Sequence, residues 1–189
     1  MSENNAPPII FDAALKAVRR QRAQTRKGRF LHTHIAKSAA ERIKDINRSF
    51  STVLVSGHSG FKDEIFTHLP EAKRPSRIYT DLTNCAPASL DMALSLLELQ
   101  SENDPIGHLI QIYEKLKPDG LLIAAMFGGE TLDGLKQAFY AFDLARFKGV
   151  TPRIFPSITH IQAGQLLDRS GYALPVIDKD TLNVNYARL

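Results

Sequence analysis

The sequence has a single cysteine, and no run of apolar residues approaches the roughly 20 that are needed to cross a lipid bilayer. The lone thiol of Cys85 cannot close an intramolecular disulfide, which suits a protein of a reducing compartment. The N-terminus is polar and lacks the apolar segment of a secretory signal. We find no internal repeat and no low-complexity tract. These absences predict a soluble, cytoplasmic protein without a membrane span.

The sequence also has little net charge. Its 24 Lys and Arg residues nearly balance its 20 Asp and Glu residues, which leaves a net charge of +4. This excess is too small to indicate nucleic-acid binding, and no nucleic-acid motif accompanies it. At 189 residues the chain suits one hydrophobic core and therefore a single domain overall. We expect a flexible tail at residues 1–10, N-terminal helices at 11–50 and an α/β domain at 51–189.

Helical periodicity begins after Asp12, a residue type that commonly precedes a helix. Leu15 and Val18 recur at helical spacing beside a surface rich in arginine, and Gly28 is expected to end this first helix. The arginine-rich surface is interpreted either as a solvated face or as a surface for an acidic protein partner. A second helix is predicted over residues 31–46 from its apolar stripe.

Strand and helix patterns then alternate along the rest of the chain. Strands are predicted at residues 52–55, 77–81, 90–97 and 121–127, of which the first and the last are expected to be buried. Helices are predicted at 60–69, 106–116, 131–144 and 163–170, and an extended stretch at 174–186. Residues 117–120 form the turn before the last of these strands. This alternation predicts a doubly wound parallel sheet of Rossmann-like type, with ligands at the carboxyl ends of its strands.

Several short strings carry a family resemblance that covers almost the whole chain. They are Phe11-Asp12, Phe30-Leu31-His32, residues 117–123 (KPDGLLI), 127–132 (FGGETL), 149–153 (GVTPR) and 166–176 (LLDRSGYALPV). Together they resemble class I S-adenosylmethionine methyltransferases, in particular the bacterial group similar to the arginine-hydroxylase assembly factor of respiratory complex I. The malonyl-carrier-protein methyltransferase of biotin synthesis is a more distant relative. The resemblance implies a truncated class I methyltransferase sheet with an N-terminal helical extension.

The chain departs from this family where the cofactor would bind. The family ends its first strand with an acidic residue and a glycine-rich loop, whereas this chain has Val55 in place of the acid and keeps only Gly57 and Gly60. Loss of a charged hydrogen-bonding partner costs about 1.5 to 3 kcal/mol, or about tenfold to more than a hundredfold in affinity. The resemblance therefore implies that S-adenosylmethionine is bound weakly or has been lost as a cofactor.

The remaining cofactor candidates are Gly57, His58, Gly60, Asp81 and Leu96. Asp81 fits the acid that holds the ribose at the end of the family's second strand, and it fits equally well as part of the third strand or as a strand-end cap. His58 would act as a base or donor in the loop, or is an ordinary loop histidine. His32 and His34 fall on different faces of a helix, so we expect no metal site. Catalytic residues cannot be assigned.

Two further parts of the family pattern are missing. The span from Asp81 to Asp91 has no room for the helix and strand that the family places there, which removes part of the adenine pocket. The family's His-Trp pair before Asn103-Asp104 is also absent. The family continues beyond Tyr186 with further helices and a last strand that closes the sheet, whereas this sequence ends at Leu189. An unpaired sheet edge favours pairing with another chain, as a homodimer or with a protein partner.

These residues predict a degenerate methyltransferase-like protein, a pseudoenzyme that acts through protein contacts in the manner of an assembly factor. The alternative is an active S-adenosylmethionine-dependent methyltransferase, or a related hydroxylase, of unknown substrate. The chain is expected to be either naturally short or a fragment.

Overall fold

The structure is a computed structural model that describes residues 9–24, 30–58 and 60–185. The chain divides into two compact units, residues 1–126 and 127–189. Most of the predicted N-terminal tail, and Gly28 at the predicted end of the first helix, lie outside the described residues. The division into a helical segment and one α/β domain stays a prediction.

In the first unit, the described residues form a four-stranded parallel sheet in the order β2-β1-β3-β4. The strands are β1 (Thr52–Ser56), β2 (Arg77–Tyr79), β3 (Leu90–Leu96) and β4 (Leu116–Ala125). Val53 of β1 pairs with Ile78 of β2 and with Met92 of β3, which places β1 and β3 at the centre. The α/β fold class predicted from the alternating pattern is therefore confirmed.

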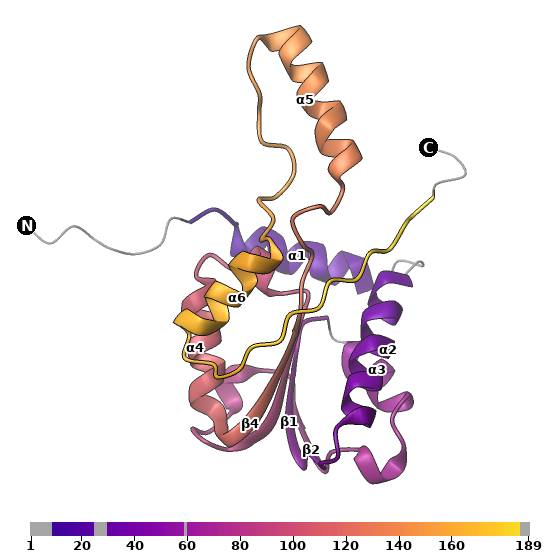
Figure 1. The fold of residues 1–189 in the computed structure, drawn as a ribbon, viewed down its shortest axis with the longest axis vertical. Helices are drawn as coiled ribbons and strands as arrows, with labels where there is room; N and C mark the ends of the chain where they lie inside the picture. The colour runs from indigo at the N-terminus through magenta and orange to yellow at the C-terminus, as the bar shows by residue number, and fades with distance from the viewer. Residues whose placement is uncertain (1–8, 25–29, 59, 186–189) are drawn as a thin grey trace, which may run out of the picture. The chain divides into compact units, whose positions relative to one another are not determined.

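Helices cover both faces of this sheet. Figure 1 shows α2 (Phe30–Asp45) and α3 (Phe61–Thr67) on one face and α4 (Pro105–Lys115) on the other. α1 (Ala13–Gln24) crosses the end of the sheet at which the strands finish. Short 3-10 helices follow at Glu71–Lys73 (η1), Leu82–Asn84 (η2) and Leu99–Ser101 (η3).

The main apolar core lies between the sheet and the α2–α3 pair. Because side chains alternate along a strand, every second residue of β1 and β3 points into this core. The buried core residues include Val53, Val55, Met92, Leu94 and Leu96 from the sheet and Ala36, Ala40, Ile43, Phe61, Ile65 and Phe66 from the helices. Each large side chain buried here stabilises the fold by about 1.5–3 kcal/mol.

β4 differs from the prediction in two respects. The predicted turn at residues 117–120 lies inside β4 as a bulge, because Leu90 pairs with Leu116 and Met92 pairs with Leu121. Asp119 within the bulge has a φ of 63°. Residues 121–127 are half-buried rather than buried. The physical reason is that β4 is an edge of the sheet, with β3 as its strand neighbour among the described residues.

The second unit contains α5 (Asp133–Phe147) and α6 (His160–Arg169). Thr159 and Gln162 form a capping box at the start of α6, and Gly171, with a φ of 85°, follows its end. Asp143 of α5 accepts hydrogen bonds from Thr151 N and from two nitrogens of Arg153, which fixes the return segment against α5. The predicted extended stretch is described to Asn185 and contains no strand over those residues.

Candidate functional site

The glycine loop after β1 packs closely against the end of β3. Gly57 has a φ of 130°, and a Cβ added to it would lie 2.3 Å from the carbonyl oxygen of Leu96. A side chain at this position is therefore excluded by the protein's own backbone. Gly60 precedes α3, and its N–H donates to His58 Nδ1 at 3.0 Å. The loop is thus shaped by local packing, and its role in cofactor binding stays a prediction.

His58 belongs to a small cluster of aromatic rings. Its ring centroid lies 5.1 Å from that of His32 on α2 and 6.2 Å from that of Phe61 on α3. His34 is exposed, so the two histidines of α2 lie on different faces, as predicted. Among the described residues, no group of three His, Cys, Asp or Glu side chains is arranged to hold a metal ion.

Asp81 follows β2 and caps η2. Its Oδ1 atom accepts hydrogen bonds from Thr83 N at 2.9 Å and from Thr83 Oγ1 at 2.7 Å. These hydrogen bonds lower the pKa of the Asp81 carboxyl group. Of the alternatives left open by the sequence, the structure therefore shows the strand-end cap, while a further role toward a ribose is untested. Cys85, at the end of η2, is buried, and this burial raises the pKa of its thiol.

The link between β2 and β3 is short. Between Tyr79 and Leu90 the chain forms η2 and then a turn at residues 87–88, with no further helix or strand. β2 is consequently the other edge of the sheet among the described residues. The region in which the family pattern has an additional helix and strand thus contains only η2 and a short turn.

The structure brings together a buried polar cluster that the sequence did not reveal. Glu98, two residues after β3, is 7% exposed, and its carboxylate accepts a hydrogen bond from the Ser56 hydroxyl at the end of β1. The same carboxylate pairs with the Arg20 guanidinium on α1. Ser95, in register with Ser56 on the neighbouring strand, is fully buried. The signal in the sequence was an acidic residue two positions after a buried strand.

Polar contacts fasten the start of the chain to the segment that contains Glu98. Asn103 Oδ1 accepts from Ile10 N and from Phe11 N at 2.8 Å each, and Asn103 Nδ2 donates to Phe11 O at 2.9 Å. Lys16 pairs with Glu102 at 2.5 Å and donates to Ser101 O at 3.2 Å. Thus α1 lies over the carboxyl end of β3 and covers the Glu98 cluster.

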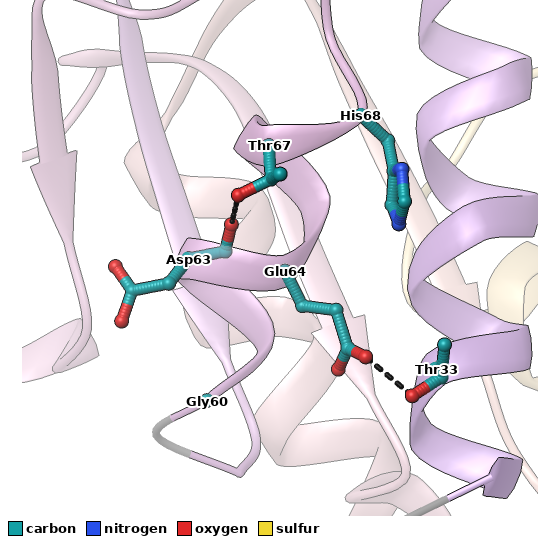
Figure 2. Close-up of a pocket in the computed structure, with 6 residues that line it drawn as sticks. All are labelled: Thr33, Gly60, Asp63, Glu64, Thr67 and His68. Atoms are coloured by element: carbon teal, nitrogen blue, oxygen red, sulfur yellow. Dashed lines mark hydrogen bonds between the residues drawn. The ribbon is translucent and has the colours of Figure 1, made fainter.

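A groove of about 450 Å³ lies beside α2 and α3 and includes Gly60 of the glycine loop (Figure 2). It is lined by Thr33, Gly60, Asp63, Glu64, Thr67 and His68. Figure 2 shows Glu64 turned toward Thr33, whose hydroxyl donates to the Glu64 carboxylate. Thr67 Oγ1 donates to the Asp63 carbonyl oxygen at 2.7 Å, within α3. The hydrogen bond between Thr33 and Glu64 connects the two helices. Figure 2 shows the Asp63 side chain directed away from α2.

The FGGET segment begins the second unit. Thr131 N donates to Gly128 O at 3.0 Å, which makes a tight turn before α5. Lys179 pairs with Glu130 at 2.7 Å and lowers the pKa of the Glu130 carboxyl group through its hydrogen bond. Glu130 therefore lies within this turn and is paired with Lys179.

Comparison with curated proteins finds relatives of two kinds. The mitochondrial arginine-hydroxylase NDUFAF5 of Danio rerio is 30% identical over 207 residues, with 94% of this chain and 63% of the relative covered. The NDUFAF5 of Rattus norvegicus is 30% identical, with 94% and 59% covered. The malonyl-[acyl-carrier protein] O-methyltransferase of Laribacter hongkongensis (strain HLHK9) is 36% identical over 117 residues, with 61% and 37% covered. The chain therefore spans about three fifths of the length of these NDUFAF5 relatives.

Solved structures give weaker likenesses. The CurJ carbon methyltransferase aligns with a TM-score of 0.48 at 14% identity, over 78% of this chain and 49% of that protein. The [4+2]-cyclase SpnF aligns with a TM-score of 0.45 at 12% identity, over 71% and 56%. No protein-family profile matches the chain.

The parallel sheet with helices on both faces and the sequence relatives define a class I methyltransferase-like protein. This confirms the resemblance stated from the sequence. More particularly, the relatives comprise the NDUFAF5 arginine-hydroxylases and the malonyl-[acyl-carrier protein] O-methyltransferases. Within the described residues, no helix is both long and apolar enough to span a membrane.

Proposed function

We propose that this chain is a methyltransferase-like protein that binds S-adenosylmethionine weakly or not at all and acts through contacts with another protein. Val55 carries the proposal. The family has an acidic residue at this position, whereas Val55 is 4% exposed and packs into the core between the sheet and the α2–α3 pair. An apolar side chain cannot replace the charged hydrogen bonds of a carboxylate.

Two further features support weak binding. The Asp81 carboxylate is already engaged by Thr83, and the short link after it replaces the family's additional helix and strand. The 207-residue alignment with the Danio rerio relative is longer than this 189-residue chain, so that relative has internal residues that this chain lacks. The short link is the natural place for some of them.

The test is transfer of a labelled methyl group. The protein is incubated with S-adenosylmethionine labelled in the methyl group and with a cell extract that supplies acceptors. We expect no labelled product above that of a heat-inactivated control. A labelled product that forms with the native protein and not with the heat-inactivated control would contradict the proposal.

The alternative is an active methyltransferase or hydroxylase, and one observation favours it. Glu98 places a carboxylate at the carboxyl end of the sheet, where open α/β sheets bind their ligands. In this alternative, a protein partner completes the cofactor pocket. The labelled methyl group would then be transferred only when that partner is present in the assay.

The proposed protein contacts include the sheet edges. Within the described residues, β2 and β4 each have one strand neighbour. An edge presents backbone N–H and C=O groups that can pair with a strand of another chain. We therefore propose a homodimer or a complex with a relative. Sedimentation equilibrium should show a species of at least twice the 21.0 kDa chain mass; a monomer at every concentration, both alone and with a relative, would contradict this.

A further inference from the structure

Helix α5 of the second unit packs against its own unit through charged side chains. Asp143 is 0% exposed, and its carboxylate accepts hydrogen bonds from Thr151 N and from the Arg153 guanidinium. Lys136 donates to Gly129 O at 2.9 Å. Lys136 and Asp143 are seven positions apart, or about two helical turns, so they lie on one face of α5. The inward face of this helix is therefore polar.

The outward surface of α5 is apolar. Its large apolar side chains are 42–62% exposed and follow two sides of the helix, with Leu135 and Phe142 on one side and Tyr140, Leu144 and Phe147 on the other. An alanine strip lies between the two sides and is also exposed, formed by Ala138, Ala141 and Ala145. A surface helix normally has the opposite arrangement, with apolar residues against the protein and charged residues in water. The described residues thus leave the apolar surface of α5 uncovered.

This apolar surface is large enough for a specific protein interface. A fully covered aromatic side chain buries about 150–250 Å², so these large side chains, each roughly half exposed, together present on the order of 500 Å². Two such surfaces in contact would bury about 1,000 Å², which reaches the lower end of the range for specific interfaces. A second copy of the chain carries the same surface, so the two surfaces match in size and in chemistry.

The charges at the two ends of α5 favour an antiparallel arrangement of two copies. Asp133 is exposed at the start of the helix, and Arg146 and Lys148 are exposed at its end. In an antiparallel pair the acidic start of each helix lies beside the basic end of the other, whereas a parallel pair brings like charges together. The antiparallel order also places the positive end of each helix dipole beside the negative end of the other.

We propose that α5 binds α5 of a second copy of this chain, in an antiparallel pair around a two-fold axis. The same patch is then used by both copies, as in most symmetric dimers. The alanine strip lets the helices approach closely, and the large side chains on either side of it pack around the contact. This inference goes beyond the proposed function, because it does not depend on cofactor binding and uses residues outside the sheet edges.

The experiment is sedimentation equilibrium of the full chain over a range of concentrations. We expect the wild type to form a dimer, and Phe142→Ser and Leu144→Ser each to raise its dissociation constant at least about tenfold. Ile161→Ser is the matched control, because Ile161 is a 64% exposed apolar residue of α6, outside the proposed surface. It should leave the dissociation constant unchanged. Urea denaturation of the monomeric forms should show equal stability for all three variants, because the replaced side chains are exposed.

Exchange of the end charges tests the antiparallel order. Asp133→Lys gives both ends of α5 a positive charge, and Arg146→Glu combined with Lys148→Glu gives both ends a negative charge. We expect each variant alone to dimerise severalfold more weakly than the wild type, because like charges meet at both ends of the pair. An equimolar mixture should form mixed dimers at least as tightly as the wild type, because each contact then joins opposite charges.

Four results would overturn the inference. A wild type that stays monomeric at every concentration would assign the α5 surface to a different protein. A loss of stability in the monomeric Phe142→Ser variant would show that another part of the same chain covers α5. A dimer that is unaffected by Phe142→Ser and Leu144→Ser would leave the sheet edges as its contact. A mixture of the charge variants that associates no better than either variant alone would exclude the antiparallel pair. The proposed loss of cofactor binding is decided separately, by methyl transfer.

Discussion

Gly57 lies so close to Leu96 that the carbonyl oxygen of Leu96 occupies the space a Cβ atom at position 57 would need, at 2.3 Å. Gly57 also has a φ of 130°, which side-chain-bearing residues rarely adopt. We predict that Gly57→Ala lowers the free energy of unfolding by about 3 kcal/mol or more, measured by urea denaturation.

Gly164 is the matched control for this substitution. It lies within α6, and an added Cβ would meet nothing within 4 Å. Gly164→Ala should therefore raise the free energy of unfolding by about 0.5–1 kcal/mol. Equal effects of the two substitutions would show that the contact between Gly57 and Leu96 is not rigid.

Val55 supports a prediction about restoring the family's acid. Because Val55 is buried in the α2–α3 core, Val55→Asp places an unpaired carboxylate among apolar side chains. We expect a loss of about 3–5 kcal/mol in unfolding free energy, against about 1–2 kcal/mol for the control Val55→Ala. Thermal unfolding and calorimetry would check this. A Val55→Asp protein that is stable and binds the cofactor tightly would show that the position faces the ligand.

Asp91 connects three parts of the sheet. Its Oδ2 atom accepts from Ser51 N at 3.0 Å and from Thr52 N at 2.8 Å, and its Oδ1 atom accepts from Lys117 Nζ at 2.7 Å. Burial alone would raise the pKa of Asp91, but Lys117 and the two amides outweigh it and lower the pKa.

We predict that Asp91→Ala costs about 2–3 kcal/mol of unfolding free energy, because two backbone amides lose a charged acceptor. The Lys117 side chain is 42% exposed, so Lys117→Met should lower the free energy of unfolding by only about 0.5 kcal/mol. Urea midpoints of the two variants provide the comparison. If Lys117→Met lowers the free energy of unfolding as much as Asp91→Ala does, the contribution of Asp91 comes from its ion pair with Lys117 and not from its hydrogen bonds to the backbone amides.

The second unit should be acid-sensitive through Asp143. Arg153 donates to Asp143 Oδ1 at 2.7 Å and lowers the pKa of this carboxyl group below its usual value of 3.8. A lowered folded-state pKa gives stability that is present above pH 3.8 and is lost as the pH falls through the folded pKa. We expect Asp143→Asn to reduce the protection of α5 amides from hydrogen exchange at pH 6, with a smaller difference from wild type near pH 3. A difference that grows toward low pH would contradict the pairing.

Most of the fold was predictable because its signals are local. The apolar stripe of α2, the β-branched run of β1 and the periodicity of α4 each lie within a short stretch of sequence. Asp12 was predicted to cap α1, and it accepts from Leu15 N at 2.9 Å. The half-burial of β4 was not predictable from its apolar sequence, because it depends on which strand stands at the edge.

The candidate site was less predictable because its contacts are distant in sequence. Glu98 meets Ser56 across 42 positions and Arg20 across 78. No local pattern connects these residues. The arginine-rich surface was interpreted as solvated or as a surface for a partner, whereas Arg20 pairs within its own chain. Between Ala13 and Arg22 of α1, the half-buried residues are Lys16 and Arg20, spaced one helical turn apart, while Leu15 and Val18 are exposed.

The most direct test of the proposed function is titration calorimetry of the wild-type protein with S-adenosylmethionine and S-adenosylhomocysteine. With Val55 in place of the family's acid, the account predicts no detectable binding, or a dissociation constant near millimolar. Binding in the micromolar range by the unmodified protein would contradict it and would identify the chain as a functional cofactor-binding protein.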